Sequence, residues 1–155
     1  ERLLSVTIAN SRADVTPQFK DVFDERIAIA LGEGMEPLVD PTINRWFTEE
    51  LRAGAPAFLD DVREMVRATP PVGYAGCARA VQHVDYLSCL AAVDKPVLLI
   101  AGAQDMATPP ECMRDIQAAI SGAQYVEFDP ASHLSNLEQP ENFTVALTNF
   151  LVARG

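Results

Sequence analysis

The sequence is poor in cysteine, and what it has forms no recognisable framework. Cys77, Cys89 and Cys112 are the only three among 155 residues, an odd number without a C-x-x-C pair. This usage excludes a disulfide scaffold and a zinc site of the usual spacing. A reducing, cytoplasmic setting fits it best, and we interpret all three as small core residues rather than nucleophiles.

Positive charge and long apolar runs are also scarce. The chain has 12 Lys and Arg against 22 Asp and Glu, a formal net charge of −10. Nucleic acids and anionic membrane surfaces would repel such a chain, and no basic patch offsets the repulsion, so we predict neither partner. No apolar run approaches the roughly 18 residues of a membrane span. The first ten residues, ERLLSVTIAN, are too short and too charged at their start for a signal peptide.

What is present is the composition of a soluble globular domain, with 48% apolar and 22% charged residues. Three segments predict β-strands: residues 3–9, the continuous apolar run 97–101, and the short segment 124–129. Helical spacing of apolar residues fills about residues 17–90, with a stop near Gly32 to Gly34. Thr108, two prolines and Glu111 predict the capped start of a further helix, and Pro140 opens the last one.

This order of elements predicts an α/β fold with a parallel sheet. Residues 1–16 and 91–155 would form the core, and the helical block 17–90 would be inserted as a lid. Polar side chains gather at the carboxyl ends of parallel strands. Asp105 and His133 each follow a strand by a few residues, and the two strands are successive. A carboxylate against imidazole Nδ1–H leaves Nε2 free to take a proton from a nucleophile, so we predict contact between these two side chains, with Asp105 as acid and His133 as base.

Four segments carry a resemblance to a known family: GAQDMATPP, SHLSNLEQPENF, RWFTEEL and ATPPVGYAGCARAV. Together they resemble the carboxyl-terminal half of an α/β-hydrolase, and specifically of the 3-oxoadipate enol-lactonases. The resemblance implies a partial α/β-hydrolase core of about three parallel strands, and a triad in the order Ser, Asp, His. Asp105 and His133 match its acid and base. It implies neither a metal nor an organic cofactor.

The sequence departs from that family in its nucleophile. No G-x-S-x-G motif occurs, and none of the six serines has the flanking glycines of a nucleophile elbow. We therefore expect one half of an enzyme, either a fragment, a nicked product or a split subunit. The missing amino-terminal half would be its partner, and the chain alone would be inactive. The strand at 3–9 would then be left as an apolar edge, prone to aggregation or to association with a second copy.

The resemblance implies hydrolysis of an enol-lactone in aromatic catabolism, the β-ketoadipate pathway. Trp46 in the lid would line an apolar pocket, or serve only as a core anchor. Arg45 would pair with a substrate carboxylate, or lie solvated on its helix. Two alternatives stay open: a general carboxylesterase or cofactor-free haloperoxidase relative, and a catalytically silent module that binds a partner. His83, in a helical stretch, is interpreted as a surface residue.

Overall fold

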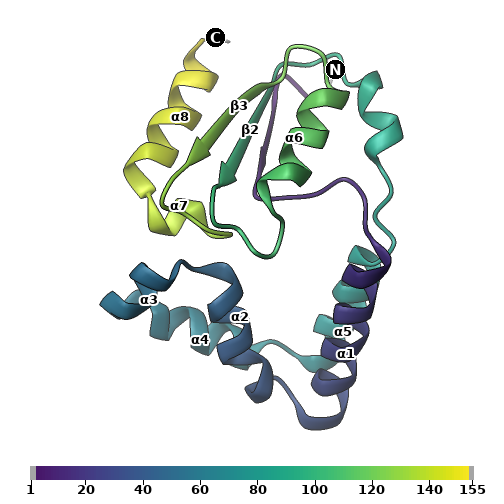
Figure 1. Ribbon diagram of the computed structural model, residues 1–155, viewed down its shortest axis with the longest axis vertical. Helices are drawn as coiled ribbons and strands as arrows, with labels where there is room; N and C mark the ends of the chain where they lie inside the picture. Colours follow the sequence, from purple (N-terminus) through teal and green to yellow (C-terminus); the bar gives the residue numbers. More distant parts are fainter. Residues whose placement is uncertain (1–2, 154–155) are drawn as a thin grey trace. The chain divides into compact units, whose positions relative to one another are not determined.

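The three predicted strands form one parallel sheet in the computed structural model, which describes residues 3–153. They are β1 (Val6–Ala9), β2 (Val97–Gly102) and β3 (Gln124–Phe128), in the order β1-β2-β3 (Figure 1). Ile8 lies opposite Leu99 in one pair, and Leu99 lies opposite Tyr125 in the other. The predicted α/β architecture with a parallel sheet is therefore confirmed.

The central strand β2 is buried along its whole length because helices cover both faces of the sheet. Its odd-numbered residues, such as Leu99, pack with Met113 and Ile116 of α6 (Pro110–Ala119). Its even-numbered residues, such as Ile100, pack with Phe150 of α8 (Pro140–Val152). Side chains alternate across a strand, so a continuous apolar run supplies both cores at once.

The block between β1 and β2 contains only helices in the described chain, as predicted. It comprises five α-helices and two short 3₁₀ helices: α1 (Pro17–Glu33), η1 (Glu36–Leu38), α2 (Val39–Trp46), α3 (Glu49–Gly54), α4 (Phe58–Ala68), α5 (Pro71–Val81) and η2 (Leu87–Ala92). The Thr16 side chain caps α1 by accepting a hydrogen bond from Phe19 N at 3.2 Å. Gly34, with φ of 85°, ends it at the predicted stop.

The chain divides into two compact units. The sheet unit contains the residues up to Ala13, the segment Arg45–Thr48 and the residues from Tyr86 onward, whereas the helical unit contains Asp14–Asn44 and Glu49–Asp85. The segment 45–48, which the sequence placed in the lid, is thus grouped with the sheet. In the helical unit, Ile27 packs with Ala75 and Ala78. No helix among residues 3–153 is long and apolar enough to cross a membrane.

The cysteines differ from their predicted core role. Cys77 and Cys89 are exposed, and Cys112 is half-buried. On α5 the buried face is occupied by Ala75 and Ala78, which turns Cys77 outward. His83 is exposed, as predicted, and its Nδ1 lies 2.7 Å from the carbonyl oxygen of Arg79.

Candidate active site

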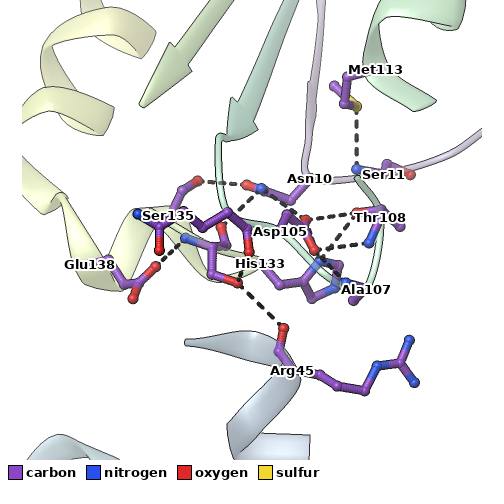
Figure 2. A network of polar contacts seen from close by, with 12 residues as sticks. Asn10, Ser11, Arg45, Asp105, Ala107, Thr108, Met113, His133, Ser135 and Glu138 are labelled. Atoms are coloured by element: carbon purple, nitrogen blue, oxygen red, sulfur yellow. Dashed lines mark hydrogen bonds and ion pairs between the residues drawn. The ribbon is translucent and has the colours of Figure 1, made fainter. Parts of the chain in front are cut away.

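Polar side chains from three loops meet at the carboxyl ends of the three strands (Figure 2). Asn10 directly follows β1, Asp105 follows β2, and His133 follows β3. The sheet is parallel, so all three loops leave it at the same edge. This is the position at which the sequence placed Asp105 and His133.

The predicted contact between Asp105 and His133 is present. His133 Nδ1 lies 2.9 Å from Asp105 Oδ2. An ionised carboxylate can only accept, so the shared hydrogen lies on Nδ1; in the neutral form of the ring, Nε2 is then the nitrogen with the lone pair. The Asp105 side chain is 0% exposed, whereas that of His133 is 23% exposed. The pair therefore has a buried acid and an imidazole that other groups can reach.

The Asp105 carboxylate accepts four further hydrogen bonds. Oδ1 accepts from the backbone nitrogens of Ala107 at 2.7 Å and Thr108 at 2.9 Å. Oδ2 accepts from the Thr108 hydroxyl at 2.8 Å and from Asn10 Nδ2 at 3.2 Å. Such a set holds the carboxylate in one orientation and compensates its removal from water.

Thr108 does not cap α6, which corrects the sequence prediction. The residue before α6 is Pro109, which has no side-chain capping bond. The hydroxyl of Thr108 instead donates to Asp105, and its oxygen lies 3.3 Å from His133 Nδ1. The bond that the Thr108 hydroxyl donates to the carboxylate is charge-assisted. It is therefore stronger than the neutral bond that the hydroxyl would accept from a backbone amide as a helix cap, which is why the hydroxyl turns toward Asp105.

The hydrogen bonds of Asp105 also set its charge state. Burial by itself raises the pKa of this carboxyl group. The hydrogen bond and charge of His133, together with the two bonds from Thr108, lower it by more, so the pKa lies below its ordinary value. Asp105 is consequently ionised at neutral pH, the state required to orient an imidazole.

The loop that carries His133, residues 129–134, is called the histidine loop here. It approaches the end of β2 closely because Gly102 has no side chain. A Cβ at Gly102 would lie 2.2 Å from the carbonyl oxygen of Ser132 and 2.7 Å from that of Ala131. The closeness allows Gln104 N to donate to the Ala131 carbonyl at 2.9 Å. Gly102 thus allows the loop that carries Asp105 (residues 103–109, the acid loop) and the histidine loop to lie close together.

Glu138, in α7 (Ser135–Glu138), joins the histidine loop to the segment 45–48. Its carboxylate accepts from the backbone nitrogen of Ser132, and from both the backbone nitrogen and the hydroxyl of Thr48. Leu134 N also donates to the carbonyl oxygen of Trp46 at 3.2 Å. These bonds explain why 45–48 is grouped with the sheet unit.

Of the two residues predicted to bind substrate, Trp46 lies beside the pair. Its ring centroid is 6.1 Å from that of His133, with an interplanar angle of 32°. The Arg45 carbonyl oxygen accepts from Ser132 Oγ at 3.4 Å, and Figure 2 shows the Arg45 side chain extending away from His133 and Asp105. The roles of both residues in binding stay predictions.

The sequence alone points to neither Asn10 nor Glu138, and for Ser135 it predicts no more than a role in shaping the loop that carries His133. Ser135 is fully buried and its hydroxyl donates to Asn10 Oδ1 at 2.6 Å. Glu138 lies within the family segment SHLSNLEQPENF, which by itself says nothing of its contacts. Within residues 3–153, no group of three or more His, Cys, Asp or Glu side chains is placed to hold a metal ion.

Known proteins resemble this chain in sequence. The sequence pattern that describes the alpha/beta hydrolase fold matches residues 35–140. The 3-oxoadipate enol-lactonase 1 of Acinetobacter baylyi is 33% identical over 97% of this chain and 55% of its own length. The chain therefore spans about half the length of this relative.

Two solved structures resemble the chain over nearly its whole length. The enol-lactonase from Burkholderia xenovorans is 34% identical, with a TM-score of 0.91 over 97% of this chain and 57% of that one. A thermophilic esterase from Thermogutta terrifontis, solved with malate bound, is 28% identical, with a TM-score of 0.89 over 98% of this chain and 57% of that one.

Proposed function

Since the chain belongs to the alpha/beta hydrolase fold family, we propose that Asp105 and His133 are the acid and base of a serine-dependent hydrolytic site. The observation that carries this proposal is the 2.9 Å bond between His133 Nδ1 and a fully buried, five-fold hydrogen-bonded carboxylate. His133 Nε2 would take the proton of a serine hydroxyl as that hydroxyl attacks an ester carbonyl. The same nitrogen would then activate the water that releases the acyl group.

The nucleophilic serine, in this proposal, belongs to a segment outside the 155 residues. The two serines nearest the pair are both engaged elsewhere. Ser135 donates to Asn10, and the Ser132 hydroxyl lies 3.2 Å from the Gln104 carbonyl oxygen. Ser132 and Ser135 are also buried, which withholds their hydroxyls from a substrate. The oxyanion-hole donors would come with the nucleophile.

The substrate we propose is 3-oxoadipate enol-lactone, opened to 3-oxoadipate. Relatives that bear the enol-lactonase name align with nearly all of this chain. Trp46, beside His133, would form an apolar wall against the lactone ring. Arg45 would swing its guanidinium to the free carboxylate of the substrate, a pairing that its planar fork favours.

The experiment combines the chain with an amino-terminal half of an enol-lactonase that contains the G-x-S-x-G elbow. We expect no enol-lactone hydrolysis by the chain alone, and hydrolysis after co-refolding that a serine-directed inhibitor abolishes. His133→Ala should lower kcat by at least about a thousand-fold, because the base acts as a unit with the nucleophile.

The other histidine provides the control. His83→Ala removes an exposed imidazole and should leave kcat unchanged. Hydrolysis by the chain alone would contradict the proposed external nucleophile. Equal activity of the two histidine variants would contradict the role of His133, and a co-refolded complex without any turnover would favour a silent binding module.

A general carboxylesterase is the second candidate, favoured by the likeness to the Thermogutta terrifontis esterase. The two candidates differ in their need for a cation that meets a substrate carboxylate. Arg45→Ala should raise KM for the enol-lactone about ten-fold or more if it pairs with that carboxylate, and should leave a neutral aryl ester unaffected. If Arg45→Ala changes KM neither for the enol-lactone nor for the aryl ester, the esterase is favoured.

A further inference from the structure

Asn10 lies between the acid loop and the histidine loop, at the end of β1. Its side chain is buried, with 9% of the residue exposed, and contacts groups from both loops. We infer that Asn10 is a positioning residue that fixes Asp105 and the backbone next to His133 relative to each other. The inference rests on the proposed function for its role in catalysis, but not for its geometry.

Each polar atom of the Asn10 amide has a partner (Figure 2). Nδ2 donates one hydrogen to Asp105 Oδ2 at 3.2 Å and lies 3.1 Å from the carbonyl oxygen of Ser132, which takes the other. Oδ1 accepts from the Ser135 hydroxyl at 2.6 Å. The three bonds determine which end of the amide carries the nitrogen.

The two donated hydrogens act on both members of the acid–base pair. Asp105 Oδ2 is the oxygen that accepts from His133 Nδ1, and Ser132 is the residue directly before His133. One planar amide thus sets the position of the accepting oxygen and of the backbone from which the imidazole extends. Thr108 also bonds Oδ2 and its hydroxyl oxygen lies 3.3 Å from His133 Nδ1, but this contact is to the imidazole ring, whereas Asn10 bonds the backbone from which the ring extends.

The backbone of Asn10 is itself held in place. Its nitrogen donates to the Ile100 carbonyl at 2.9 Å, which continues the ladder between β1 and β2. Its φ is 46°, in the left-handed region that asparagine tolerates better than most residues. An aspartate here would present an acceptor to Asp105, and an apolar residue would leave the Ser132 carbonyl without this donor.

A purely structural role would give the same contacts, so the test must read the His133 ring itself. We would record the ring ¹⁵N and Nδ1–H proton signals of His133 in the full chain for four proteins: unchanged, Asn10→Ala, Asn10→Gly and Asn142→Ala. Asn10→Gly removes the amide and also relieves the positive φ, so it separates loss of the donor from backbone strain. Asn142 is an exposed asparagine on α8 and serves as the matched control.

We expect the low-field Nδ1–H signal to be lost or moved to higher field in both Asn10 variants, and the Nδ1–H tautomer to lose population to Nε2–H. Asn142→Ala should keep the signal of the unchanged chain. A folded Asn10→Gly protein with an unchanged His133 signal would overturn the inference.

If neither Asn10 variant folds, the unchanged chain still decides. The Asn10 side-chain amide proton that is donated to Asp105 should shift as acid protonates this carboxylate, because the carboxylate is its acceptor. Amide signals that stay fixed through that titration would also overturn the inference. None of these measurements uses a lactone or a serine, so a failed hydrolysis experiment and a failed positioning experiment remain distinguishable.

Discussion

Glu138 Oε1 accepts hydrogen bonds from both the backbone nitrogen and the hydroxyl of Thr48, each at 2.8 Å. The same carboxylate bonds the backbone nitrogen of Ser132 in the histidine loop. Thr48 follows Trp46 by two residues, so one side chain connects the residue before His133 to the segment that carries the tryptophan. The position of Trp46 beside His133 therefore depends in part on the Glu138 carboxylate.

Glu138→Ala should lower stability and move Trp46. Three donors lose their partner, at a cost of about 1–3 kcal/mol in the free energy of unfolding. Trp46 is the only tryptophan, so its fluorescence emission reports its surroundings directly. We expect a red-shifted emission in Glu138→Ala and a smaller shift in Glu138→Gln, which keeps one acceptor oxygen. Emission unchanged in both variants would show that Trp46 is held by other contacts.

Asp105→Asn should make stability less dependent on acid pH. The pKa of Asp105 is lowered in the folded chain, so its carboxylate stabilises the fold at neutral pH. That contribution is lost as the pH falls through the folded pKa, which lies below the ordinary value of 3.8. Denaturant unfolding should show the unchanged chain more stable by about 1–3 kcal/mol at neutral pH, with the difference shrinking below about pH 4.

The control for that experiment is Asp115→Asn, which removes an exposed carboxylate from α6. It should follow the pH dependence of the unchanged chain. A difference between the unchanged chain and Asp105→Asn that stays constant down to strongly acid pH would contradict the lowered pKa.

Gly102→Ala should be destabilising, whereas Gly76→Ala should not. The added methyl at Gly102 would clash with the carbonyl oxygens of Ala131 and Ser132, and overpacking of this kind costs about 1–3 kcal/mol. Gly76 lies inside α5 with nothing within 4 Å of an added Cβ, so alanine there should stabilise by roughly 0.5–1 kcal/mol. Thermal unfolding of the two variants measures whether each substitution lowers or raises stability. A Gly102→Ala protein as stable as the unchanged chain would show that the histidine loop can move aside.

Thr7→Lys should reduce self-association. In the described chain β1 pairs with β2 alone, which leaves its other edge without a strand partner. Thr7 is exposed on this edge strand, and an edge lysine opposes strand pairing. Sedimentation over a range of concentrations should show association of the unchanged chain that Thr7→Lys weakens. Thr144→Lys, exposed on α8, adds the same charge and should leave association intact.

The sheet and the contact between Asp105 and His133 were predictable because their signals are local. A strand buried on both faces must be a continuous apolar run, as residues 97–102 are. Asp105 and His133 stand out because each follows a predicted strand, and parallel pairing brings strand ends together. Neither inference needed a contact between distant residues to be known in advance.

The supporting residues could not be predicted in the same way. Asn10 follows its strand as many turn residues do, and its partners lie 95 to 125 residues away in the sequence. In α4, the apolar spacing predicts a buried face of Phe58, Val62, Met65 and Val66, and the structure does bury Val62 and Val66. It also buries Leu59 to 1% exposure and leaves Met65 56% exposed, because one apolar pattern allows two faces about 100° apart.

The distance along the chain between Asn10 and Ser135 has a consequence for the order of folding. Their hydrogen bond closes a loop of 125 residues, and the bond from Asn10 to Asp105 closes one of 95. Contacts so far apart in sequence must pay the entropy of loop closure before they contribute, so they form slowly and late. The helices can form before Asp105 and His133 meet, and the Nδ1–H signal of His133 should appear only when β1, β2 and β3 have come together. The appearance of this proton signal therefore reports when the last step of folding takes place.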